Sequence, residues 1–152
     1  RIAAVRRLMP DAFIGIDVIV GFPGETDADF RTTYDFLAEL KPAFLHIFPF
    51  SERPGTPAVD LPGKVQSSVA TARVAELEGL CDRLHGDFCV RAVGTEDTVL
   101  FESTRRGGMM FGFSGNYRRV KAPYDAAKVN TLCRVKLGAM DESHDLMGEI
   151  RD

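Results

Sequence analysis

The sequence predicts an α/β region followed by a small all-β module, and three observations support this division. An apolar, mostly β-branched run at residues 14–20 stops at a turn rich in glycine and proline and is followed by a helical pattern. A second apolar run at residues 43–50 follows that helix, as in a parallel βα unit. From Gly94 the pattern changes to short β-rich segments separated by glycine-rich and acidic turns, which is typical of a closed or nearly closed barrel.

Length and composition set the protein class. The 152 residues are 45% apolar, which suffices for a hydrophobic core, and the net charge of -3 argues against bulk electrostatic capture of nucleic acid. The sequence has no apolar span of membrane length and no leader, so we expect a soluble cytoplasmic protein without a membrane partner. It begins with Arg1 rather than methionine, so we expect a piece of a longer protein.

The cysteines predict free thiols in a reducing compartment. Cys81, Cys89 and Cys133 are odd in number and widely spaced, which does not suit a disulfide framework. Cys81, His85 and Cys89 recur at helical spacing and could touch one metal ion. Cys81 also falls in an apolar helical stripe, however, which favours buried thiols, so no metal site is predicted.

The first elements lead to a candidate ligand site. Residues 1–9 look like the end of a helix, and residues 13–20 predict a strand covered on both faces, in which Asp17 needs a partner or a polar cavity. Pro23 and Gly24 fit a type II turn, and Gly21 permits a close approach. Thr26 is a natural N-cap, with Asp29 completing a capping-box variant, for a helix over residues 27–40.

A strand, a turn and a helix N-terminus in this order mark the edge where α/β proteins bind ligands. An ordinary βα connection explains the same glycines equally well. Thr26 and Asp27 stand where a phosphate-binding loop would need lysine, which argues against binding of a nucleoside triphosphate.

The second strand, residues 43–50, is followed by a loop over residues 51–63 that is dense in proline and glycine. In that loop, Ser51 and Arg53 could contact a carboxylate, a phosphate or an RNA backbone. The alternative is a solvated loop arginine. Residues 65–92 predict a long helix that packs back on the strands.

The all-β module predicts five short strands, over residues 98–102, 109–113, 117–122, 132–137 and 145–150. Between residues 105 and 121 the module carries five basic residues with no acid among them: Arg105, Arg106, Arg118, Arg119 and Lys121. Phe111, Phe113 and Tyr117 are interleaved with them, and arginines beside aromatics are how single-stranded RNA is held. Some of these aromatics must instead face the core, because side chains alternate along a strand.

Two motifs resemble a known family. The run from Asp17 to Thr26, followed by Asp29-Phe30 and Thr33-Tyr34, resembles the fifth strand and following helix of the radical S-adenosylmethionine methylthiotransferases. The run from Leu45 to Ala58 is similar to their sixth strand and its exit loop, in the branch that modifies threonylcarbamoyladenosine in tRNA.

The module after Gly94 resembles the TRAM module that ends these enzymes and binds tRNA. The matching residues are Val99-Leu-Phe-Glu102, Gly112-Phe-Ser-Gly-Asn-Tyr-Arg118 and Leu146-Met-Gly-Glu149, with Ser114 where threonine is usual and Gly115 where a larger residue is common.

The resemblance implies the last two βα units of a partial (β/α)6 radical S-adenosylmethionine barrel over residues 1–92, including the linking helix 65–92. A five-stranded, OB-like TRAM domain would occupy residues 93–152. The implied enzyme is a tRNA methylthiotransferase that adds a methylthio group to C2 of N6-threonylcarbamoyladenosine 37. It would use S-adenosylmethionine and two 4Fe-4S clusters in the full-length protein. The Cys-x-x-x-Cys-x-x-Cys cluster ligands are absent here, so we expect this piece alone to be inactive.

The same resemblance implies roles for individual residues. The cofactor side would use Asp17, Ile19, Gly21, Glu25 and Phe48, with Asp17 and Glu25 either as polar contacts to the cofactor or as supports of the turn. Ser51 and Arg53 would lie on the substrate-facing rim, and the basic and aromatic residues of the module would bind the tRNA anticodon stem-loop. The missing N-terminal domains would be partners within the chain, and their loss would leave sheet edges open to self-association.

Two alternatives remain open from the sequence. One is an RNA-binding module without chemistry, in which the α/β region is only a scaffold. The other is a radical enzyme that acts on a ribosomal protein.

Overall fold

The computed structural model describes residues 1–151, and the chain forms two compact units. The sheet unit is Ile14–His85, and the barrel unit is Arg1–Phe13 together with Gly86–Asp152. The long helix α3, Ser67–Val90, contributes to both units.

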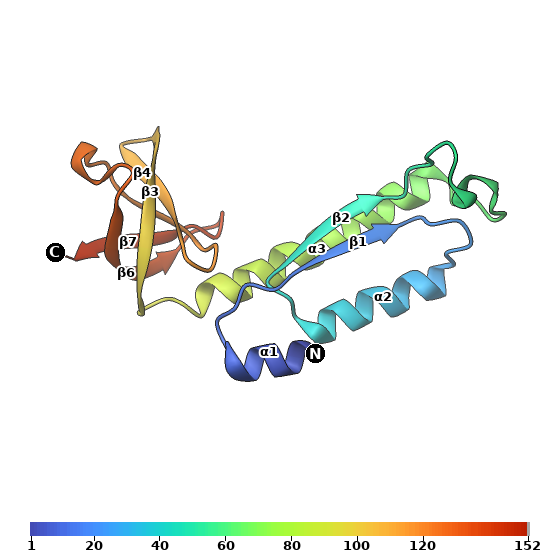
Figure 1. Ribbon diagram of the computed structural model, residues 1–152, viewed down its shortest axis with the longest axis horizontal. Coiled ribbons are helices and arrows are strands. Elements are labelled where there is room, and N and C mark those ends of the chain that lie inside the picture. Colours follow the sequence, from blue (N-terminus) through green and yellow to red (C-terminus); the bar gives the residue numbers. More distant parts are fainter. Residues whose placement is uncertain (152) are drawn as a thin grey trace. The chain divides into compact units, whose positions relative to one another are not determined.

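The sheet unit contains two parallel strands with a helix between them in sequence. Strand β1 is Gly15–Val20, helix α2 is Asp27–Leu40 and strand β2 is Phe44–Pro49. Gly15 pairs with Phe44, and the register continues to Val20 opposite Pro49, so both strands end at the same edge (Figure 1). The predicted strand–helix–strand order is confirmed.

Helix α2 begins where its cap residue predicts. The Thr26 hydroxyl accepts a hydrogen bond from the Asp29 N–H at 3.2 Å, and the Asp29 carboxylate accepts one from the Thr26 N–H at 2.9 Å. Hydrogen bonds from the Thr26 side chain and then its backbone lower the pKa of Asp29. Lys41 ends the helix in the left-handed conformation, at a φ of 51°.

Only one face of the two strands is covered, so the prediction of coverage on both faces is wrong for the residues described. Val18, Val20 and Leu45 pack against α2 and α3 in one core. The opposite side, here called the open face, carries Asp17 opposite His46 and Ile19 opposite Phe48, all of them exposed. An apolar run on the open face reads like a buried one, because sequence does not show which faces are covered.

Side chains of α3 form hydrogen bonds with the backbone at the start of β2, on the edge that does not pair with β1. The Leu45 N–H donates to the Cys81 sulfur at 3.2 Å, and the Cys81 thiol is 3.6 Å from the Leu45 carbonyl oxygen that accepts from it. One turn further, His85 Nδ1 lies 3.2 Å from the Ala43 carbonyl oxygen. Burial is the main cause that raises the pKa of the Cys81 thiol, which stays protonated and able to donate.

The barrel unit holds a closed five-stranded barrel, as the sequence predicts. Its strands are β3 (Glu96–Arg106), β4 (Met109–Ser114), β5 (Arg119–Pro123), β6 (Leu132–Met140) and β7 (Leu146–Arg151). They close in the order β3-β4-β5-β7-β6, with β5 and β7 parallel and the other pairs antiparallel. Val99, Phe101, Met110, Val120, Val135 and Leu146 form the centre of the core and are fully buried.

The barrel is tightly packed where β3 pairs with β4, at Phe101 opposite Gly112. A Cβ on Gly112 would collide with the Leu100 carbonyl oxygen and would lie 2.8 Å from the Phe101 Cα. Only glycine allows the two backbones to approach this closely. Strand β5 starts later than predicted, because Tyr117 adopts a φ of 62° and belongs to the turn before it.

Three short elements complete the chain. Helix α1 is Ile2–Leu8 and has no buried residue, and the 3-10 turns are η1 (Pro57–Asp60) and η2 (Ala126–Lys128). Within residues 1–151, no helix is long and apolar enough to cross a membrane.

Candidate functional site

The carboxyl ends of β1 and β2 meet at the turn that the sequence singled out. Gly21 and Gly24 have φ values of 79° and 90°, and the Glu25 N–H donates to the Phe22 carbonyl oxygen at 2.9 Å, as a type II turn requires. A Cβ on Gly21 would lie 2.9 Å from the Ala70 Cβ of α3. The close approach predicted at Gly21 is therefore made by α3.

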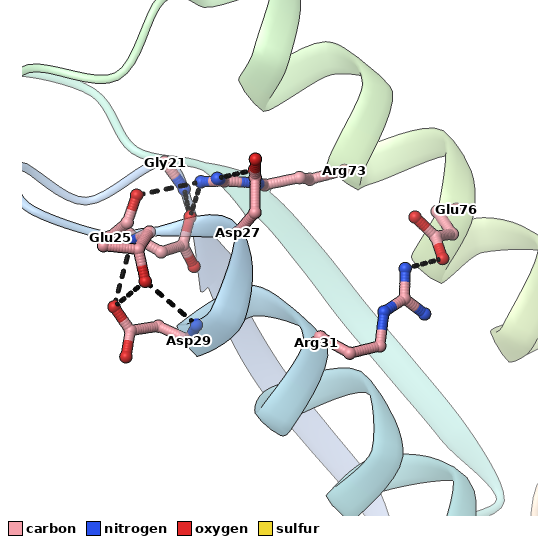
Figure 2. A network of polar contacts seen from close by, with 8 residues as sticks. Gly21, Glu25, Asp27, Asp29, Arg31, Arg73 and Glu76 are labelled. Atoms are coloured by element: carbon pink, nitrogen blue, oxygen red, sulfur yellow. Dashed lines mark hydrogen bonds and ion pairs between the residues drawn. The ribbon is translucent and has the colours of Figure 1, made fainter.

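Glu25 lies inside this turn. Its Oε2 accepts hydrogen bonds from the Gly21 N–H at 2.6 Å and from Arg73 at 2.5 Å (Figure 2). The Arg73 and Glu25 side chains are only 6% and 13% exposed. Of the two roles considered for Glu25, contact with the cofactor and support of the turn, the geometry favours support.

The open face continues into a hollow at the carboxyl ends of the strands. Its volume is about 480 Å³, within the range of small-molecule sites. The residues around it are Ile19, Phe48, Pro49, Phe50, Ser51, Arg53, Thr56 and Ala58. The structure thus brings together four predicted site residues, two from the cofactor set and two from the substrate set.

The hollow suits the flat, apolar face of a purine. Ile19 and Phe48 lie opposite each other in the strand register and are 58% and 51% exposed, which is unusual for side chains of their size. Asp17 lies two residues before Ile19 on the same face, outside the hollow.

Arg53 has a fixed backbone and an available side chain. Its carbonyl oxygen accepts hydrogen bonds from the Thr56 hydroxyl at 2.8 Å and the Thr56 N–H at 3.2 Å. Its guanidinium is exposed and forms no ion pair within residues 1–151. The side chain is therefore free to bind an anionic or carbonyl group at the rim of the hollow.

Of the five basic residues predicted to bind RNA, two have no acidic partner among the described residues, two are paired with acids, and the fifth, Arg118, is buried. Arg105 lies 4.4 Å from the centre of the Tyr124 ring, Arg106 is exposed beside it, and neither forms an ion pair in the described part of the chain. Arg119 is 3.6 Å from Asp145, and Lys121 pairs with Asp141. The acids missing from the local sequence come from the loop before β7.

Arg118 is buried, in contrast to the predicted contact with RNA. The residue is 3% exposed, its guanidinium lies 4.2 Å from the centre of the Phe88 ring, and Asp11 is 3.7 Å away. Burial lowers the pKa of Arg118. Its neighbour Tyr117 is 68% exposed and Phe113 is 39% exposed, so both aromatics are available for stacking. Phe111, at 7%, is a core residue.

Sequence reasoning missed Arg73 and Tyr124. Arg73 precedes Leu77 and Leu84 on the buried stripe of α3, and a charge at a buried helical position demands a partner. That signal could have identified it. Tyr124 lies after β5 and meets Arg105 only through the fold, so no local pattern reveals it.

The residues present do not fit an iron–sulfur cluster. Within residues 1–151, no group of three or more His, Cys, Asp or Glu side chains could hold a metal ion. Cys81, Cys89 and Cys133 are buried and form no disulfide within residues 1–151. Burial is the main cause that raises the pKa of the Cys81 and Cys89 thiols, which disfavours the thiolate form that ligates iron.

No protein-family model matches the chain. It is 34% identical over 144 residues to threonylcarbamoyladenosine tRNA methylthiotransferase MtaB of Bacillus subtilis, with 90% of the chain covered. It is 35% identical over 135 residues (88% of the chain) to tRNA-2-methylthio-N(6)-dimethylallyladenosine synthase of Magnetococcus marinus. The enzyme of that name from Psychrobacter cryohalolentis is 33% identical over 156 residues, or 99% of the chain.

The chain spans 31% of the length of each of these curated relatives. The match to the Psychrobacter cryohalolentis enzyme covers 99% of the chain. It therefore includes both strands of the sheet, the turn after β1 and the barrel. The homologues of this chain, over nearly all of its residues, are tRNA methylthiotransferases.

Proposed function

We propose that the chain is the C-terminal part of a tRNA methylthiotransferase that adds a methylthio group to C2 of N6-threonylcarbamoyladenosine 37. The observation that carries the proposal is the hollow, where exposed apolar residues of the open face adjoin an unpaired loop arginine. The homologues support the reaction class, and they include enzymes named for two different N6 groups. The match of residues 45–58 to the threonylcarbamoyl branch favours that group.

In this proposal, residues 1–92 complete a radical S-adenosylmethionine barrel, and residues 93–152 are a TRAM domain. The open face of β1 and β2 then lines the inside of the barrel, which explains why Ile19 and Phe48 have no cover in the described residues. Upstream strands of the same chain would supply the cluster ligands. The whole protein would act on tRNA in the cytoplasm.

Ile19 and Phe48 would hold the adenosyl group of S-adenosylmethionine, which would supply the radical chemistry for hydrogen abstraction at C2 once an upstream cluster had donated an electron. The residues of this chain bind and orient. Ile19 and Phe48 pack on the adenine face and exclude water from it, because both offer only apolar surface. Arg53 and Ser51, at the rim of the same hollow, hydrogen-bond the carboxylate of the threonylcarbamoyl group.

The barrel unit would hold the anticodon stem-loop through the β3–β4 hairpin. Arg105 and Arg106 are the basic residues there that no acid neutralises, and Tyr124 stacks with the first of them. Tyr117 and Phe113 add exposed aromatic surface. Arg119 and Lys121 contribute less, because each already has an acidic partner, and the buried Arg118 serves as a support.

The deciding experiment expresses the complete reading frame in a bacterial strain that lacks its own methylthiotransferases, followed by nucleoside mass spectrometry of tRNA. The 2-methylthio derivative of threonylcarbamoyladenosine is the expected product. The 2-methylthio derivative of dimethylallyladenosine would instead show that the enzyme belongs to the other branch. If neither product forms, the chain is part of an RNA-binding protein without chemistry or of an enzyme that acts on a ribosomal protein. A methylthiolated protein in the same cells would identify the second case.

The RNA surface has its own test. Arg105→Ala/Arg106→Ala in the full-length protein should weaken binding of the anticodon stem-loop about tenfold and reduce the salt slope by about two, because two phosphate contacts are lost. Arg134→Ala is the matched control, since that arginine is 74% exposed but paired with Glu96 at 2.7 Å. Equal losses in both variants would mean that binding follows net charge alone.

A further inference from the structure

Arg73 is a buried arginine on α3 whose partners all lie in or beside the turn after β1. One nitrogen of its guanidinium, Nη1, donates to Glu25 Oε2 at 2.5 Å, and the other, Nη2, donates to Asp27 Oδ1 at 2.7 Å (Figure 2). The ring of Phe30 lies beneath, with its centre 5.4 Å from the guanidinium carbon. The side chain is 6% exposed, so it is held by the protein rather than by water.

The contact reaches the backbone of the turn through Glu25. The same oxygen that accepts from Arg73 accepts from the Gly21 N–H at 2.6 Å. Gly21 directly follows Val20, the last residue of β1, and Ile19 of the hollow is one residue further back. The charge on Arg73 therefore holds Glu25 in the position in which it fixes the end of β1.

Loss of Arg73 would release this turn. Glu25 is only 13% exposed, and a carboxylate at such a site without its cation is expected to rotate toward water. That rotation removes the acceptor of the Gly21 N–H. Ala70, one turn earlier on α3, packs against Gly21 and limits where the turn can move.

A second ion pair joins α2 to α3 and allows two possible roles of Arg73 to be distinguished. One role is to tie the two helices together, and the other is to support the turn after β1. Arg31 of α2 pairs with Glu76 of α3 at 2.6 Å, with side chains 50% and 41% exposed, and it makes no contact with the turn (Figure 2). A role in tying α2 to α3 would be shared by both pairs. Of these two arginines, only Arg73 contacts Glu25, and through it the Gly21 N–H after β1.

We propose that Arg73 is a positioning residue for the adenosyl group of S-adenosylmethionine, acting through Glu25 and the Gly21 N–H. The inference rests on the function proposed above. It assigns to α3, which lies outside the hollow, control over the position of Ile19 and thus over the apolar surface that meets the purine. Arg73 itself touches no substrate or cofactor.

The test uses the full-length enzyme with Arg73→Met, Glu25→Met and, as the control, Arg31→Met. Methionine at position 25 removes the oxygen that accepts from Arg73 and from the Gly21 N–H. Equilibrium dialysis measures the dissociation constant of S-adenosylmethionine, and hydrogen exchange measures protection of residues 18–26. Arg73→Met should raise the dissociation constant and the KM for S-adenosylmethionine about tenfold, the usual effect of losing a charged hydrogen bond. The kcat and the affinity for the tRNA stem-loop should stay within about twofold.

Further variants test whether Arg73 acts on S-adenosylmethionine binding through Glu25. Arg73→Met and Arg73→Met/Glu25→Met should weaken binding equally, because both act through one contact. Arg73→Lys should restore part of the affinity, since an ammonium can meet Glu25 but not Glu25 and Asp27 in the same planar geometry. Should Arg73→Met not fold, Glu25→Met carries the same prediction, because it removes the acceptor of the Gly21 N–H.

Three outcomes decide the matter. A folded Arg73→Met or Glu25→Met enzyme that binds S-adenosylmethionine as tightly as the wild type would overturn the positioning role. Equal weakening in Arg31→Met would also overturn it, because the effect would then come from tying the helices. A wild-type enzyme that binds no S-adenosylmethionine would instead refute the proposed function, and the positioning role with it.

Discussion

The sheet unit and the barrel unit differ in how completely they bury their apolar side chains. Every strand of the barrel has two strand neighbours, and Phe101 and Val120 at its centre are fully buried. The sheet has two strands, and Ile19 and Phe48 on its open face are more than half exposed, at 58% and 51%. The barrel unit thus encloses the apolar residues at its centre, whereas the sheet unit buries one face of its strands and leaves apolar residues of the other face exposed.

The largest expected effect tests this difference with two phenylalanines. Phe101→Ala should destabilise the barrel unit by about 3–5 kcal/mol, because it leaves a cavity in a closed core. Phe48→Ala should change stability by less than about 0.5 kcal/mol, because its side chain already meets water. Urea unfolding of the 152-residue chain with hydrogen exchange resolved by unit measures both, and similar losses would refute the comparison.

Two glycines of the barrel unit compare a closely packed position with an open one. Gly112→Ala should cost about 3 kcal/mol, because its Cβ would meet the backbone of β3. Gly115→Ala should be nearly neutral, since nothing lies within 4 Å of its Cβ position. The thermal midpoints of the two variants, followed by circular dichroism, give the contrast, and a stable Gly112→Ala protein would mean that β3 and β4 can separate without loss.

A smaller, local effect is expected in the sheet unit. Thr26→Ala removes the N-cap of α2 and should lower its local stability by about 1 kcal/mol, seen as faster hydrogen exchange in residues 27–40. Thr32→Ala is the matched control, because its hydroxyl bonds only the Ala28 carbonyl within the same helix. Faster exchange in the control alone would show that the cap is not what stabilises the start of the helix.

The smallest effect is a pH dependence of the barrel unit. A hydrogen bond from Lys121 is the main cause that lowers the pKa of Asp141. Since the folded pKa lies below the unfolded one, the stabilisation is present above the unfolded value of about 3.9 and is lost as pH falls through the folded value. Asp141→Asn should flatten the fall in the urea midpoint on acidification, and an unchanged slope would contradict the pairing.

Local patterns in the sequence predict most of the fold. The helix over residues 27–40, its capping residues, the type II turn and the five-stranded barrel are confirmed. These features depend on residues close together in the chain, where spacing and turn chemistry act directly.

The remaining features depend on contacts between distant residues. The partners of Arg119 and Lys121 come from the loop before β7, and Arg118 is buried against Phe88. The open face was predicted as covered because exposed and buried apolar residues are identical in sequence. Of the candidate site, Ile19, Phe48, Ser51 and Arg53 were predicted and lie together, whereas the partnership of Glu25 with Arg73 was not predicted.

The contacts of α3 with the start of β2 have a consequence for the addition of a further strand. Cys81 and His85 occupy backbone groups of Leu45 and Ala43. A strand that paired at this point of the edge would have to displace both side chains, so α3 disfavours extension of the sheet from the start of β2.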